Sequence, residues 1–92
     1  MIESFRHKGL EQFFTTGKAR GINAQHAAKL RRLLFALSTA ETPENMTAPS
    51  YRLHQLRGDR QGQWAVWVSG NWRLVFEFQG TDVVNVDLVD DH

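Results

Sequence analysis

The spacing of apolar residues changes from a helical to a strand period near the middle of the chain. In HKGLEQFFTTG (7–17) and GINAQHAAKLRRLLFALSTA (21–40), apolar residues recur three and four positions apart, which predicts two amphipathic helices. Gly17 ends the first helix, and Asn23 is a good N-cap for the second. From Tyr51 onward the period is two, in the runs YRLHQL, WAVWV, NWRLVFEF and DVVNVDLV, which is typical of β-strands.

Short glycine-containing segments, RGDRQGQ, SG and QGT, separate the four strand runs. Turns of this length join neighbouring antiparallel strands, so the runs predict a meander. The N-terminal MIESF favours a further short strand, and no repeat or linker divides the chain. We therefore predict an α+β fold, with two N-terminal helices packed on a mostly antiparallel sheet, in one compact domain of residues 1–92.

Alternation along the strands assigns side chains to the two faces of the sheet. In NWRLVFEF, Arg73 lies on the face opposite the apolar residues at even positions. In the last run, Val84 and every second residue after it, through Asp90 to His92, are expected to share a face. The pattern does not say which face of each strand covers the helices, so convergence of His54, Arg73 and His92 stays open.

Composition restricts the classes of protein. The chain has no cysteine, which excludes disulfides and thiolate zinc sites. No apolar run of the kind a signal peptide needs is present, and none approaches the roughly 20 residues of a membrane span. We expect a cytoplasmic protein that does not contact a membrane.

Charge is unevenly distributed. Residues 1–73 contain all 11 Lys and Arg residues and five acidic residues, whereas residues 74–92 contain five acidic residues and no basic one. Eight of the 11 bases are arginines, which bind phosphate through a planar fork, so the basic part favours a polyanion partner. The alternative is a chance imbalance on a solvated surface.

The chain also carries the residue types needed to cleave RNA through its own 2′-hydroxyl. One group must take the 2′-OH proton, another must protonate the departing 5′-oxygen, and a cation must balance charge on the phosphoryl oxygens. Histidine titrates near neutrality and arginine is permanently charged, so the two suit these tasks. This chemistry needs no metal and no cofactor, and it excludes DNA, which lacks the nucleophile.

Three segments, in this order and at this length, resemble the HigB toxins of the RelE superfamily: MIESFRHKGLEQFF, YRLHQLRGDRQGQWAVWVSGNWRLVFEF and VDLVDDH. The most specific pieces are LRGDR, the NWRLVF strand and a histidine soon after a strand. The resemblance implies a bacterial toxin of a toxin–antitoxin pair, which enters the A site of the 30S ribosomal subunit and cuts mRNA there without metal. It also implies a HigA-type helix-turn-helix antitoxin, through which the toxin binds operator DNA.

The resemblance further implies roles for individual residues. His54 matches the histidine of the first meander strand, and Arg73 matches the strand arginine at the scissile phosphate. Asp90 and His92 match the acid and the histidine of the terminal motif. We take His54, His92 and Asp90 as the proton-transfer set. Arg73, assisted by Arg57, is the predicted phosphate clamp.

Two positions depart from the family pattern. Arg57 stands where relatives commonly have lysine, which keeps the positive charge. Asp91 stands where the common ending has tyrosine, so an aromatic that stacks on a base or donates a proton is replaced by a carboxylate. We expect this carboxylate to weaken RNA binding.

The second predicted helix carries three cations largely off its apolar stripe: Lys29, Arg31 and Arg32. We predict that they contact 16S rRNA. The three tryptophans of the strand runs favour core and cross-strand packing over a base-stacking platform.

Each predicted site residue also has a structural interpretation. His54 is consistent with a histidine held by a structural hydrogen bond, and Arg73 with an ion pair to Glu77 two positions away. The C-terminal acids are consistent with a solubilising tail, and His54, Asp90 and His92 with a metal triad that the chemistry above does not need.

Two other functions compete with a ribosome-dependent toxin. One is a catalytically silent module that binds the antitoxin or acts as co-repressor, which the Asp91 departure favours. The other is a ribonuclease that acts without ribosomes.

Overall fold

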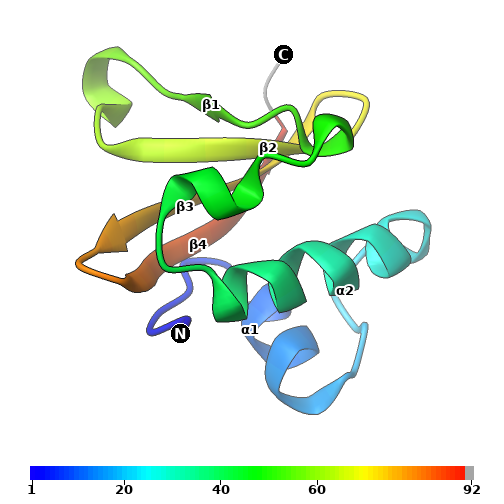
Figure 1. The fold of residues 1–92 in the computed structure, drawn as a ribbon. Coiled ribbons are helices and arrows are strands. Elements are labelled where there is room, and N and C mark those ends of the chain that lie inside the picture. The colour runs from blue at the N-terminus through cyan, green and yellow to red at the C-terminus, as the bar shows by residue number, and fades with distance from the viewer. Residues whose placement is uncertain (91–92) are drawn as a thin grey trace.

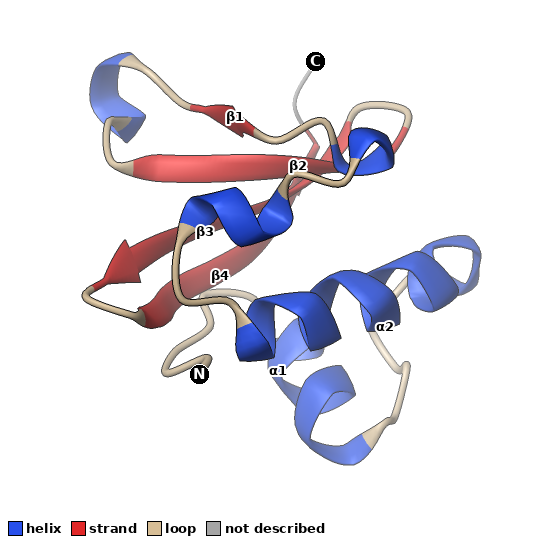
Figure 2. Cartoon of the chain, viewed as in Figure 1, coloured by secondary structure: helices blue, strands red, loops and turns tan. Residues whose placement is uncertain are grey.

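The computed structural model describes residues 1–90, so Asp91 and His92 lie outside the described residues. The chain forms a helical layer and a sheet layer (Figure 1). The helices are α1 (Lys8–Thr16) and α2 (Ala24–Thr39), and the strands are β1 (His54–Gln55), β2 (Gln63–Ser69), β3 (Trp72–Gln79) and β4 (Asp82–Asp90). Three short 3-10 helices, η1 (Pro43–Met46), η2 (Pro49–Tyr51) and η3 (Gly58–Arg60), lie in the connections (Figure 2).

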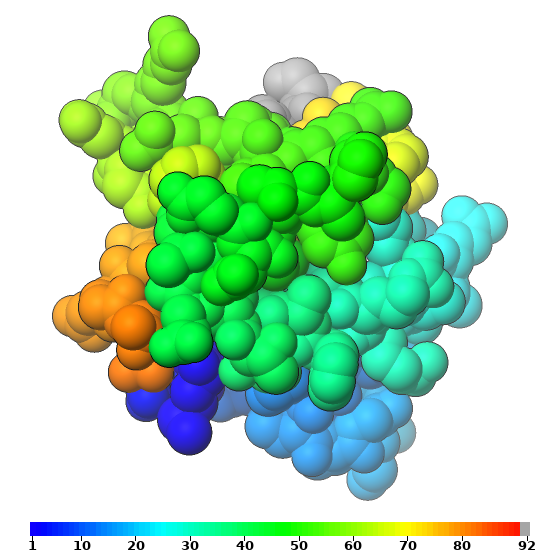
Figure 3. All heavy atoms as spheres, in the orientation of Figure 1, coloured from blue at the N-terminus to red at the C-terminus, as the bar shows by residue number. Residues whose placement is uncertain are grey.

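The strands form one antiparallel meander in the order β1-β2-β3-β4. The two helices pack on one face of this sheet, which confirms the predicted α+β fold. In the space-filling view, the segment that carries η1 and η2 lies beside α2 (Figure 3).

Both helices begin and end where the sequence predicts. The Nδ1 atom of His7 accepts the first-turn N–H of Leu10 at 3.1 Å, and the side chain of Asn23 accepts that of Gln25 at 2.8 Å. Gly17 takes the left-handed conformation, with φ of 79°, and its N–H binds the Phe13 carbonyl. These caps satisfy backbone groups that the helical ladder leaves free.

Two strands are shorter in the structure than the sequence pattern predicts. The YRLHQL run keeps only His54–Gln55, because η2 occupies its start and Arg52 takes a positive φ of 51° that a strand does not allow. MIESF forms only isolated parallel bridges to β4, from Ile2 to Val83 and from Phe5 to Val86.

The core lies between the helices and one face of the sheet, called the inner face here. Leu30 and Leu34 of α2, Val66 of β2, and Leu74 and Phe76 of β3 are among its fully buried side chains. Even-numbered β3 residues therefore face the helices. The odd-numbered residues, including Arg73, lie on the opposite face of the sheet, called the outer face here.

A β-bulge at Asn85 corrects one prediction. Glu77 pairs with Val84 and Val75 pairs with Asp87, so β4 carries an extra residue between these pairs, and Asn85 has φ of 56°. The prediction that Val84 shares a face with the later even-numbered residues was wrong, because the bulge shifts the alternation by one. Asparagine tolerates the left-handed region better than most residues, which explains its place here.

Within residues 1–90, no helix is long and apolar enough to cross a membrane.

Candidate active site

The outer face of the sheet brings two predicted site residues onto one surface. His54 pairs with Ala65, Ala65 pairs with Val75, and Val75 pairs with Asp87. Partners in a ladder point to the same side, so these four side chains form one row across the outer face. Arg73 lies on the same face in the adjacent row, two strands from His54. Two strand spacings are about 10 Å. This separation suits a nucleotide bound between His54 and Arg73 better than a direct contact between the two side chains.

Arg73 is oriented by backbone carbonyls rather than by a carboxylate. One guanidinium nitrogen of Arg73, Nη1, donates to the carbonyl oxygen of Gly70 at 3.0 Å. It also donates to the carbonyl oxygen of Trp72, the preceding residue, at 3.2 Å. Glu77 accepts instead from the side-chain amides of Gln63 at 3.3 Å and Asn85 at 3.2 Å. The suggested Arg73–Glu77 ion pair is therefore wrong for this structure.

Within residues 1–90, no ion pair joins the Arg73 guanidinium to an acidic side chain. An ion pair in that part of the chain joins the N-terminal ammonium of Met1 to Asp82 instead. The positive charge of Arg73 is thus available to an anion on the outer face.

The environment of His54 selects one tautomer. Its Nδ1 lies 3.1 Å from the carbonyl oxygen of Arg52. A carbonyl only accepts hydrogen bonds, so Nδ1 carries the proton and Nε2 of the neutral ring carries the lone pair. The positive φ of Arg52 directs this carbonyl, and the imidazole is exposed. His54 therefore has the form of a base whose second nitrogen is open to a substrate.

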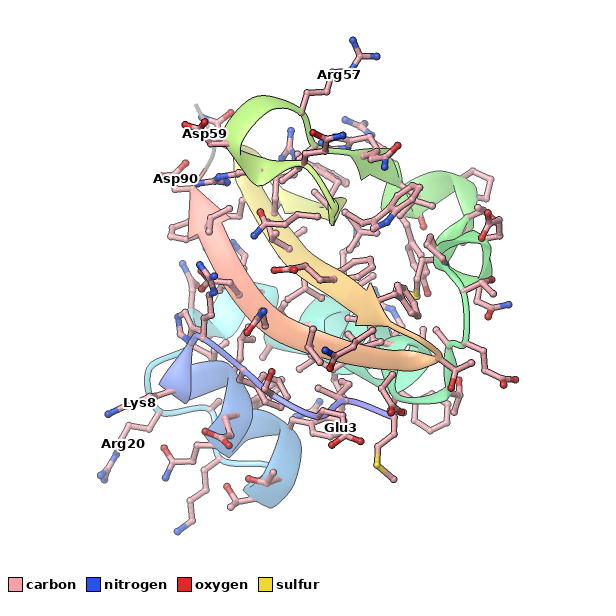
Figure 4. The ribbon with its side chains drawn as sticks, turned by 90° about the vertical axis from the view of Figure 1, so that its left-hand side faces the viewer. Glu3, Lys8, Arg20, Arg57, Asp59 and Asp90 are labelled. Atoms are coloured by element: carbon pink, nitrogen blue, oxygen red, sulfur yellow. The ribbon has the colours of Figure 1, made fainter. Side chains whose placement is uncertain are left out.

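The remaining predicted site residues are less closely grouped. Arg57, the N-cap of η3, is exposed and projects away from the sheet in Figure 4. Asp90 is exposed at the end of β4 and pairs with Trp72, which assigns it to the inner side of the strand. His92 lies outside the described residues, as does Asp91.

The three cations of α2 do not form one surface. Arg32 lies about 60° around the helix from Lys29 and Arg31 about 200° away, because each residue turns the helix by about 100°. Accordingly, Lys29 approaches Trp67 of β2, with Nζ 4.1 Å from the ring centroid, whereas the Arg31 guanidinium lies 5.3 Å from the Phe13 ring in α1.

A cationic cluster surrounds Trp67. The guanidinium of Arg52 also stacks on this ring, at 4.3 Å, and Lys29 donates to the Ser50 carbonyl at 3.2 Å. Partial burial, and then the charges of Arg32 and Arg52, lower the pKa of Lys29 below its usual value. A site whose cations repel one another binds an added anion favourably.

The carbonyl of Gly70 connects this cluster to Arg73. It accepts both the indole N–H of Trp67, at 2.9 Å, and the guanidinium of Arg73. Trp67 and Arg73 are also directly paired across β2 and β3. Consecutive contacts through Trp67 and the Gly70 carbonyl therefore connect Lys29 of α2 to Arg73 on the outer face.

Comparison with known protein families shows to which family the chain belongs. Residues 3–92 match the model of the HigB-like toxin family, described as RelE-like toxins HigB of type II toxin–antitoxin systems. The chain belongs to the HigB-like toxin family. Over 92 residues, all of both chains, it is 38% identical to a protein named Endoribonuclease HigB from Proteus vulgaris.

Solved structures show the same fold. The toxin superposes on YafQ from E. coli strain BL21(DE3) with a TM-score of 0.59 and 15% identity. A histidine-to-glutamine mutant of E. coli YafQ gives 0.58 and 20% identity. Each comparison covers 98% of this chain and 91% of the YafQ chain.

Two functional candidates of this HigB-like toxin were not predicted from sequence. The sequence predicts only a packing role for Trp67, and it assigns no role to Arg52 in the YRLHQL run. Alternation in β2 contains a signal for Trp67, because it lies opposite the buried Val66 and Val68 and pairs with Arg73. Alternation does not place Arg52, which precedes β1 and takes a left-handed φ. The other two tryptophans, Trp64 and Trp72, pack against the core as predicted.

Residues 1–90 contain no group of three His, Asp or Glu side chains placed to hold a metal ion. The metal triad considered from sequence includes His92, which lies outside the described residues.

Proposed function

We propose that this toxin is an endoribonuclease that cuts mRNA in the ribosomal A site, using the 2′-hydroxyl of the RNA as nucleophile and no metal. The observation that carries the proposal is the shared outer face of His54 and Arg73, on which the imidazole presents a lone pair and the guanidinium has no carboxylate partner within the described residues. The name of the Proteus relative agrees with the enzyme class.

In the proposed reaction, Nε2 of His54 takes the proton of the 2′-hydroxyl. The resulting oxygen attacks the adjacent phosphorus and forms a 2′,3′-cyclic phosphate, while the bond to the 5′-oxygen breaks. His92, assisted by Asp90, returns a proton to that oxygen, so one proton is taken up and one released. The family resemblance implies only that His54, Asp90 and His92 form the proton-transfer set and does not say which histidine is the base. We assign the base to His54 because its Nδ1 lies against the Arg52 carbonyl, which leaves the role of acid to His92.

Arg73 stabilises the phosphorane. Charge grows on the non-bridging oxygens as the bond forms, and a fixed guanidinium stabilises this charge more in the transition state than in the substrate. The Gly70 and Trp72 carbonyls hold the guanidinium in place through one nitrogen and leave its other edge for phosphate.

We assign ribosome contact to Lys29 and Arg52, which stack on Trp67, and to Arg32, whose charge acts on Lys29. A surface of this kind binds the rRNA backbone without reading sequence, and affinity falls as salt rises. Arg57 is a separate contact on η3, with rRNA or with a substrate phosphate.

The proposed partner is a HigA-type antitoxin, and operator DNA is bound only through it. Asp91 favours a second function, in which a catalytically silent toxin serves the antitoxin as co-repressor. Growth arrest on induction, with antitoxin binding intact, supports the nuclease. Antitoxin binding without arrest supports the co-repressor.

The nucleophile is tested with an mRNA that carries one 2′-deoxynucleotide at the cleavage position, placed on programmed ribosomes. We expect cleavage of the all-ribose mRNA, a 2′,3′-cyclic phosphate on the upstream product, and no cleavage of the substituted mRNA. Cleavage of both, or equal cleavage of free mRNA without ribosomes, would contradict the proposal.

A further inference from the structure

An apolar groove lies between the two helices, away from the outer face of the sheet. Phe13, Phe14 and Gly17 of α1 and its C-cap line one side, and Arg31, Leu34 and Phe35 of α2 line the other. Its volume is about 250 Å³. The groove has no role in the chemistry proposed above.

Two large apolar side chains at this groove are exposed to solvent. Phe35 is 71% exposed and Phe14 is 38% exposed. Within residues 1–90, Met1 is the only other large apolar residue with comparable exposure. An apolar patch of this kind, formed by adjacent residues rather than scattered ones, marks a surface that another molecule covers.

The charge of the groove restricts what covers it. Arg31 is its one charged lining residue, and its guanidinium stacks on Phe13 without an ion pair in the described part of the chain. The whole of α2 contains no acidic residue. The complementary surface therefore combines an apolar side chain with a carboxylate.

A second copy of this chain does not meet that requirement. In a two-fold dimer the same patch meets itself, so the Arg31 residues and the two basic α2 helices would face each other. RNA is also a poor match, because the phosphate-binding cations Lys29 and Arg32 lie on another side of α2.

We propose that a segment of the antitoxin docks in this groove, as a helix that inserts a large apolar side chain between Phe14 and Phe35 and places a carboxylate on Arg31. Membership of a type II toxin family requires an antitoxin partner, and helix-in-groove binding uses anchors of this kind. Phe35 is the energetic centre of the interface, and Arg31 sets the register of the helix.

The test is a titration of the antitoxin encoded with this toxin against four toxin variants. We expect Phe35→Ser and Arg31→Glu to raise Kd on the order of tenfold or more. The matched controls are Val84→Ser, a partly exposed apolar residue on the outer face, and Lys8→Glu, an exposed cation at the start of α1, and both should keep the wild-type Kd.

Three further measurements keep the result interpretable. Phe35→Leu should retain binding within about threefold, because it keeps an apolar anchor, and circular dichroism should show Phe35→Ser folded, because the side chain is mostly exposed. Phe35→Ser should also cleave mRNA on ribosomes as the wild type does, which separates this proposal from the proposed nuclease function.

An unchanged Kd for both Phe35→Ser and Arg31→Glu overturns the proposal. It is also overturned if Phe35→Ser converts a toxin dimer into a monomer in sedimentation without changing antitoxin affinity, since the groove then belongs to a second copy.

Discussion

Replacement of Arg73 by alanine should remove most of the cleavage activity while leaving the fold intact. The guanidinium has five N–H donors, and its hydrogen bonds within residues 1–90 are the two from Nη1 to backbone carbonyls. The edge formed by Nε and Nη2 is therefore left for the phosphoryl oxygens. Arg73→Ala deletes both the charge and this two-point contact.

The expected magnitude follows from that geometry. Loss of one preorganised donor group at a developing charge costs about 3–4 kcal/mol in the transition state, which is roughly a hundredfold to a thousandfold in rate. Arg73→Lys restores the charge but not the planar fork, so its rate should lie between those of Arg73→Ala and the wild type. Stability should change little, because each lost hydrogen bond contributes only about 0.5–1.5 kcal/mol and the freed carbonyls are near solvent.

The assay is single-turnover cleavage of mRNA on programmed ribosomes, with urea unfolding of each variant. Arg20→Ala is the matched control, because Arg20 is an exposed arginine in the loop between the helices, away from the outer face (Figure 4). A folded Arg73→Ala variant that cleaves within about threefold of the wild type would refute the assignment of Arg73 as the phosphate clamp.

Three other predictions follow from the site and the fold. Trp67→Ala should weaken cosedimentation with ribosomes and reduce its dependence on salt, because Lys29 and Arg52 lose the ring that positions them; an unchanged salt slope argues against this surface. Asp91→Tyr should increase cleavage and growth arrest, measured after induction in cells, and a decrease would reveal a role for this carboxylate. Asn85→Val should lower the free energy of unfolding by about 1–3 kcal/mol in urea, because a β-branched residue is strained at this φ, whereas Asn85→Gly should lower it less.

The sequence predicts most of the architecture because the signals concerned are local. Gly17 and Asn23 bound the helices through their own side-chain and backbone preferences, and strict alternation identifies β2 and β3. Alternation fails at Asn85, where a single left-handed residue inserts a bulge that leaves no trace in the hydrophobic period. Alternation also fails before His54, because the left-handed conformation of Arg52 interrupts the extended backbone there.

The candidate site is predicted only in part because it depends on long-range geometry. The family resemblance identifies His54 and Arg73, but the strand register is needed to place them on one face. The carbonyl that selects the His54 tautomer and the Gly70 carbonyl that holds Arg73 are backbone atoms, which residue types do not reveal. The separation of Arg31 from Lys29 follows from helix geometry and was within reach of the sequence alone.

In the proposed cleavage of mRNA on the ribosome, His54 takes the 2′-OH proton. The most direct measurement maps mRNA 5′ ends from translating ribosomes incubated with the wild type and with His54→Gln, which keeps a polar side chain but has no basic nitrogen. We predict cuts within A-site codons for the wild type and their loss in His54→Gln. The same cuts at the same rate in both proteins would contradict this prediction.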